Sequence, residues 1–165
     1  MKQSLFSFPD PVNEVAARTV AAGVVVMAVL ALALDVPWLL VPLAYGFWAR
    51  VLTGPTLSPL GQLATRVVAP ALPVAARPTP GPPKRFAQAI GTVMTSAAVV
   101  VWATVGWGAA AWLVGLLAAA AFLEAAFGLC LGCRLFALGM RMGLVPEHVC
   151  EACADISRRP QALAP

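Results

Sequence analysis

Charged residues are scarce in this chain. Only 11% of its 165 residues are Asp, Glu, Lys or Arg, whereas 61% are hydrophobic and the mean hydropathy is +0.86. A soluble domain is typically about a quarter charged, so this chain has too little polar surface to cover a water-soluble globule. Lipid removes the need for a polar exterior, and the composition therefore predicts a membrane protein.

Familiar catalytic motifs are also missing. The sequence contains no phosphate-binding loop, no nucleophile triad pattern, no zincin motif and no visible internal repeat. The net charge of +4 comes mainly from single basic residues beside apolar segments, so it does not indicate nucleic-acid binding. Basic residues in such places are typical of topology signals and of attraction to anionic lipid head groups. The lipid bilayer is therefore the partner that the composition predicts.

Long apolar runs predict an all-α fold, a polytopic bundle of four transmembrane helices in one membrane domain. A run of about 20 residues, at 1.5 Å per residue, spans a hydrocarbon core of about 30 Å. Asp10-Pro11 is a typical helix start before the first run. The four helices are expected at about 15–34, 37–53, 90–106 and 109–131.

The central loop and the C-terminal tail have different compositions. Residues 58–72 have an amphipathic pattern, which suits either an interfacial helix or a segment packed under the bundle. Residues 73–83 are rich in proline and are expected to form an extended linker. Residues 134–165 are less apolar, and we expect them to form a short cytoplasmic tail.

Basic residues also predict the orientation of the chain. In the four-helix arrangement all 11 Lys and Arg residues fall on one side, the side of the N-terminus, the central loop and the C-terminal tail. The opposite turns, around Asp35 and Gly106, contain none. The positive-inside rule places the basic side in the cytoplasm, so both termini are expected there.

All four cysteines form a single constellation. Cys130 and Cys133 make one C-x-x-C motif, Cys150 and Cys153 make another, and 16 residues separate the two motifs. Four thiolates at this spacing can enclose a zinc ion. A C-x-x-C motif can instead exchange between dithiol and disulfide, and such thiols can also carry a persulfide or hold an iron–sulfur cluster.

We expect thiol–disulfide exchange or sulfane-sulfur relay chemistry, with Cys130 and Cys133 near the membrane and Cys150 and Cys153 as a mobile pair. A thioredoxin-like or rhodanese-like protein would be the partner, and Arg134 favours its neighbour Cys133 as the attacking thiol. A permanent disulfide is disfavoured in the reducing cytoplasm. The alternative is a non-enzymatic scaffold whose four cysteines hold zinc or, less favoured, an iron–sulfur cluster. A small transporter is a weaker alternative.

Two further titratable residues are candidates for the site. Glu124 is the one acid inside a predicted membrane run, and such groups usually face the bundle interior. On an ideal helix Glu124 and Cys133 would point in opposite directions, unless Gly128 or Gly132 breaks the helix. His148 is the sole histidine; it could be a ligand or tune a thiolate, and a solvated loop position is the other interpretation.

Three segments carry a resemblance to a known family. They are Phe8 to Glu14, Pro82 to Gly91, and Gly128 to Cys133, which reads Gly-Leu-Cys-Leu-Gly-Cys. With them the chain, from about Phe8 to Ile156, resembles the bacterial membrane family named domain of unknown function 4395. The resemblance implies a four-span bacterial inner-membrane protein and implies no activity.

Overall fold

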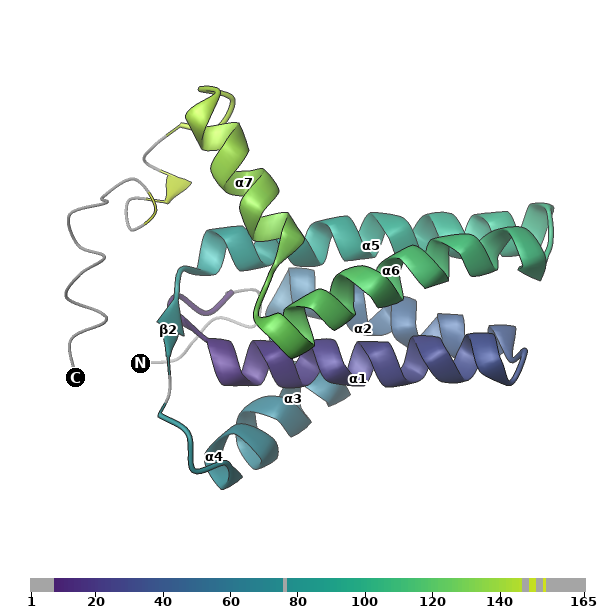
Figure 1. Cartoon of the computed structure of the whole chain (residues 1–165), viewed down its shortest axis with the longest axis horizontal. Helices are drawn as coiled ribbons and strands as arrows, with labels where there is room; N and C mark the ends of the chain where they lie inside the picture. Colours follow the sequence, from purple (N-terminus) through teal and green to yellow (C-terminus); the bar gives the residue numbers. More distant parts are fainter. Residues whose placement is uncertain (1–7, 76, 147–148, 151–152, 154–165) are drawn as a thin grey trace.

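Four helices lie side by side along the long axis of the molecule (Figure 1). The computed structural model describes residues 8–75, 77–146, 149, 150 and 153. Helix α1 packs mainly against α6, α2 packs against α5, and α5 also contacts α6. The bounds are α1 Glu14–Ala33, α2 Leu40–Thr53, α5 Gly81–Thr104 and α6 Trp107–Phe127, with a short 3-10 helix, η1 (Pro37–Leu39), before α2.

Three of these helices, α1, α5 and α6, are long and apolar enough to cross a membrane. Helix α2 has 14 residues, so it is about 21 Å long, which is less than a hydrocarbon core of about 30 Å. Large apolar side chains on the long helices point outward and are exposed, among them Val26, Val93 and Leu116. The mostly helical fold and the membrane character expected from the sequence are therefore confirmed.

The bundle core consists of aliphatic side chains and one phenylalanine. Small residues let the helices approach closely: a Cβ added at Gly91 of α5 would overlap the ring of Phe47 on α2. This contact fixes α2 against α5 even though α2 is short. The buried core residues are Val24, Ala28, Leu40, Leu43, Phe47, Ala98, Val114 and Leu117.

The segment between α2 and α5 is helical at first and packs against α1. It contains α3 (Pro59–Leu63), the π-helical turn η2 (Ala64–Val68) and α4 (Ala69–Ala71). The Leu60 side chain lies over Gly23, and Ala64, which is fully buried, clusters with Ala16 and Val20. The side chains of Leu63 and Val67 stay exposed.

Helix α5 begins earlier than the sequence suggested. It starts at Gly81, whereas the linker was expected to continue through Pro83 and the helix to begin at Ile90. Pro82 and Pro83 lie in the first helical turn, where a missing N–H breaks no hydrogen bond. Proline content alone therefore gave the wrong boundary.

The expected cap of the first helix also lies elsewhere. Asn13 is the N-cap of α1, and its side-chain oxygen accepts the Val15 N–H at 2.9 Å. Asp10 Oδ1 instead accepts the Gly81 N–H at 3.0 Å, at the start of α5. Strand β1 (Val12–Asn13) pairs antiparallel with β2 (Pro78–Thr79), so the starts of α1 and α5 are held together.

Candidate thiol and buried-charge site

A helix break at Gly128 shapes the cysteine region. Helix α6 ends at Phe127, and Gly128 adopts a left-handed conformation with φ of 68°. Its N–H donates to the Glu124 carbonyl, and the Leu129 N–H donates to the Leu123 carbonyl. The fourth membrane helix was expected to continue to Leu131, but the chain turns at Gly128 and forms a separate helix, α7 (Leu131–Arg141), which leaves the bundle (Figure 1).

A side chain from α1 stabilises the end of α6. The Arg18 guanidinium donates to the Ala125 carbonyl at 3.0 and 3.1 Å and to the Ala126 carbonyl at 2.9 Å. These are carbonyl groups that lack partners within a helix, and a cation is favourable at this end of the helix dipole. Arg18 therefore fixes the point from which the cysteine segment departs.

Cys130 and Cys133 lie at the beginning of α7. Cys130 is the N-cap, and its sulfur accepts the Cys133 N–H at 3.4 Å. Cys130 is buried, Cys133 is half-buried, and both thiols are free. Gly132 between them packs directly on α5, where an added Cβ would come within 2.5 Å of the Ala87 Cβ. The motif therefore lies on the α5 surface.

The two thiols have unequal electrostatic environments. The pKa of Cys130 is lowered, chiefly because the Cys133 side chain hydrogen-bonds to it; burial and the charge of Glu124 oppose this shift, and Lys84 supports it. The pKa of Cys133 is raised, because it donates this hydrogen bond and because it is buried. These shifts, together with the Cys133 N–H that donates to Cys130 Sγ, favour Cys130 as the first thiolate, whereas the sequence-based expectation for Cys133 depended on Arg134.

A buried ion pair lies beside the thiols. Lys84 Nζ of α5 is 2.6 Å from Glu124 Oε1 of α6, and the two side chains are 11% and 15% exposed. Both charges are close enough to influence the Cys130 thiol. The break at Gly128 brings Glu124 and the cysteines to one site, which an unbroken helix would have prevented.

Glu124 and Cys130 also line a cavity of about 290 Å³, which we call the cysteine cavity. Arg50, Gln88 and Gly132 line it as well. Arg50 is only 5% exposed; its Nε donates to Gln88 Oε1 at 2.9 Å, and its Nη1 lies 3.3 Å from the Ser58 hydroxyl oxygen. Arg50 Nη2 is buried and has no hydrogen-bond partner among the described residues.

Arg50 and Lys84 were missed by the sequence reasoning as site residues. Both stand at the ends of apolar runs, where a basic residue is usually a topology signal. Arg50 falls four residues after Gly46, so its side chain runs back along α2, and its Nη1 is 3.0 Å from where a Cβ at Gly46 would lie. The spacing of four residues between Gly46 and Arg50 was the only sign in the sequence that the Arg50 side chain is buried along α2.

The second cysteine pair is in a different state. Cys150 and Cys153 form a disulfide, and Cys150 is buried. Within the part of the chain that the structure describes, no group of three or more His, Cys, Asp or Glu side chains is arranged to hold a metal ion. The four-cysteine zinc or iron–sulfur site, which was the alternative interpretation, is thus not formed among the described residues, and His148 lies outside them.

A family model covers most of this structure. Residues 12–141 match the model described as "Domain of unknown function (DUF4395)", and the chain belongs to this family, as its motifs had indicated. No curated protein and no solved structure matches the chain. The matched range includes the Lys84–Glu124 pair and the first cysteine motif and ends before the second motif.

Proposed function

We propose that this member of the family is a thiol–disulfide exchange protein of the bacterial inner membrane, with Cys130 and Cys133 as its reactive pair. The observation that carries the proposal is the placement of the pair at the start of α7, where the Cys133 N–H points to Cys130 Sγ. A thiolate at a helix N-terminus is stabilised by free N–H groups and the helix dipole. The neighbouring Lys84 adds a positive charge, which its partner Glu124 offsets, so the helix N-terminus and Cys133 are the main support for the thiolate.

The reaction transfers two electrons from the Cys130–Cys133 dithiol to a disulfide. The Cys130 thiolate attacks one sulfur of the acceptor disulfide, the acceptor S–S bond breaks, and its leaving thiolate takes up a proton. The Cys133 thiol then loses its proton and attacks Cys130 Sγ, which forms the Cys130–Cys133 disulfide and releases the second acceptor thiol. The acceptor is a protein disulfide, and a thioredoxin-like protein is the partner class that fits this chemistry.

The Cys150–Cys153 pair serves as the second pair of the relay in this proposal. One pair is a dithiol and the other a disulfide, so the chain contains both partners of an exchange reaction. Disulfides in a reducing compartment are usually transient, catalytic or redox-sensing. A cytoplasmic position of the tail is therefore consistent with a disulfide that turns over.

Trapping experiments on the purified chain test the reactive pair. In a Cys150→Ser/Cys153→Ser background, a peptide disulfide should form a stable mixed disulfide with Cys133→Ser, because Cys130 attacks and no other thiol resolves the product. Cys130→Ser should form none, and the double variant Cys150→Ser/Cys153→Ser is the matched control that should keep the first step. One zinc ion per chain with four equally protected thiols would sink the exchange proposal and favour the scaffold.

The proposed orientation places the cysteine end of the bundle in the cytoplasm. It includes four crossings, with α2 and η1 together forming the second, and both termini cytoplasmic. Support comes from the basic residues, since the described turns at 34–36 and 105–106 contain no Lys or Arg. Reporter fusions after Leu34 and Gly106 should be external, and those after Arg77 and Pro165 internal. An internal signal at Gly106 would contradict this topology.

A further inference from the structure

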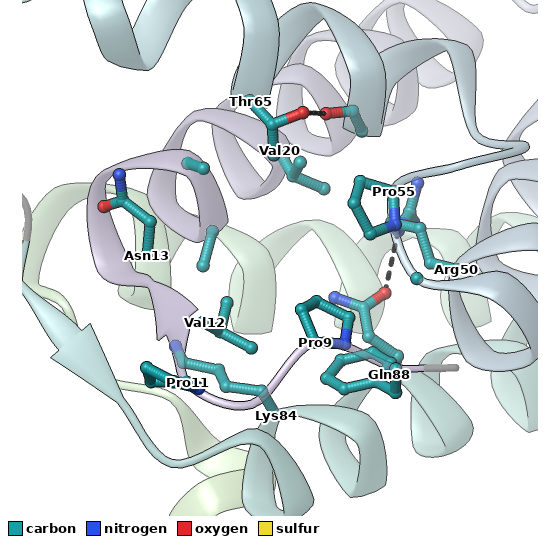
Figure 2. A pocket seen from close by; sticks show the side chains of 15 residues that line it. Pro9, Pro11, Val12, Asn13, Val20, Arg50, Pro55, Thr65, Lys84 and Gln88 are labelled. Carbon is teal, nitrogen blue, oxygen red and sulfur yellow. Dashed lines mark hydrogen bonds between the residues drawn. The ribbon is translucent and has the colours of Figure 1, made fainter. Parts of the chain in front are cut away.

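A second cavity shares Arg50 with the cysteine cavity, has neither Cys130 nor Cys133 in its lining, and has no part in the exchange reaction. It measures about 160 Å³, and we call it the proline cavity because Pro9, Pro11 and Pro55 line it. Arg50, Gln88, Ala17 and Val20 line both this cavity and the cysteine cavity. Figure 2 shows the Arg50–Gln88 hydrogen bond and the Lys84 side chain at different sides of the proline cavity.

The charge lining this cavity is unbalanced. Arg50 and Lys84 are its charged lining residues, and no Asp or Glu occurs among the described residues that line it. Glu124 forms its ion pair with Lys84, and its charge also reaches Arg50, but the direct contacts of Arg50 are neutral: Gln88, Ser58 and the face of the Phe47 ring. A buried charge normally requires a countercharge, because removing it from water costs several kcal/mol.

The hydrogen-bond donors are also in excess. Arg50 Nη2 is the buried side-chain atom without a partner among the described residues. The Gln88 amide oxygen accepts from Arg50, which leaves its NH₂ group as a donor, and an ammonium group such as that of Lys84 has three donors. These groups suit an acceptor that carries one negative charge and two or three oxygens.

We propose that the proline cavity binds a small organic monoanion, whose carboxylate or sulfonate is held by Arg50 and the Gln88 amide and whose apolar part lies among the prolines. The apolar lining, with Val12, Ala16 and Val20 beside the prolines, excludes a fully hydrated ion. The size fits a single ring, since a dry cavity of about 150 Å³ accommodates benzene. This binding site goes beyond the exchange reaction and does not depend on it.

Titration calorimetry on the full chain in a neutral detergent, at constant ionic strength, tests the site. The probes are benzoate, benzenesulfonate and the uncharged isostere benzamide. Benzoate or benzenesulfonate should bind saturably at one site per chain. Benzamide should bind with an affinity at least about tenfold lower, because the charge-assisted hydrogen bonds are lost. Equal binding of benzamide, or no saturable binding of either acid, overturns the proposal.

Two variants locate the binding. Arg50→Gln should weaken benzoate binding about tenfold or more, whereas Arg66→Gln, which removes an exposed cation, should leave it unchanged. Ala17→Leu keeps Arg50 and fills the cavity, so it should also abolish binding, and it carries the test if Arg50→Gln does not fold. Unchanged binding in folded Arg50→Gln or Ala17→Leu overturns the site.

A last arm separates a small ligand from a lipid head group. Dihexanoyl phosphatidic acid offers the same anionic oxygens on a lipid. If it binds and neither small acid does, the site is a lipid site and the proposal is overturned. If the phosphatidic acid binds and benzoate displaces it from the same site, the small-anion proposal is supported.

Discussion

The two ends of the helix bundle differ in how they are built. At one end the turns between α1 and α2 and between α5 and α6 are joined by aromatic packing, with the Trp38 and Trp102 rings edge to face at 5.0 Å. The sequence has no Lys or Arg between Arg18 and Arg50 or between Arg85 and Arg134, so that end has no basic residue. The other end has Arg18, Arg50 and the Lys84–Glu124 pair.

This difference shows that the groups that are energetically costly to bury are confined to one end of the bundle. The apolar end needs only packing and a lipid-compatible surface, which hydrophobic sequence supplies without special geometry. Buried charges at the other end are costly, and their geometry must be held by neighbours on several helices. Polar groups that persist in a membrane protein interior commonly mark function, and the thiols and both cavities lie at this end.

The largest expected effect comes from separating the buried ion pair. Glu124→Gln or Lys84→Met leaves a partner buried without its counter-charge, which should lower the free energy of unfolding by about 3–5 kcal/mol. The double variant Lys84→Met/Glu124→Leu should recover most of this loss. Unfolding in detergent, followed by circular dichroism, measures all three. Single variants as stable as the unsubstituted chain would remove the energetic distinction between the two ends.

This ion pair also shows what the sequence could not reveal. Hydropathy located the apolar runs and the all-α membrane character, because lipid-facing helices need only composition and length. Glu124 was recognised as a candidate from its position in an apolar run. Its partner was not, because Lys84 stands between the expected linker and an apolar run, where a basic residue is usually a topology signal; in the structure Pro82 and Pro83 begin α5, and Lys84 lies within this helix.

The cysteine site was predictable in its members and less so in its geometry. The exclusive C-x-x-C spacing identified Cys130 and Cys133 as a pair. Their proximity to Glu124 depends on the left-handed Gly128, one of two glycines at which a break was considered. Arg50 required knowledge of tertiary packing, since exposed and buried arginines look alike at the end of an apolar run.

Two glycine substitutions test close helix packing and should change the free energy of unfolding less than separation of the ion pair does. Gly132→Ala should lower the free energy of unfolding by about 1–3 kcal/mol, because the new methyl group meets Ala87 of α5 and displaces α7. Gly115→Ala in α6 is the matched control. A Cβ there meets nothing within 4 Å, so the substitution should be neutral or stabilising by up to about 1 kcal/mol.

Thiol reactivity gives a second readout of the same pair of variants. Displacement of α7 should expose Cys130, so Gly132→Ala should be alkylated faster at this cysteine, whereas Gly115→Ala should not change the rate. Equal stabilities and rates in the two variants would show that close packing of α7 on α5 does not shield the thiol.

The smallest expected effect is electrostatic and concerns the two thiols themselves. The Cys133 side chain is the main reason that the pKa of Cys130 is lowered, with burial acting against it. Cys133→Ala removes this donor, so the pKa of Cys130 should rise and less thiolate should be present near neutral pH. In a Cys150→Ser/Cys153→Ser background, the pH midpoint for alkylation of Cys130 should therefore move upward, while the rate at high pH, where the thiol is fully ionised, should stay the same. Arg134→Gln is the control, because Arg134 is exposed and does not contribute to the shift. A midpoint that moves with Arg134→Gln and not with Cys133→Ala would make Arg134, and not the hydrogen-bonded thiol pair, the source of the lowered pKa of Cys130.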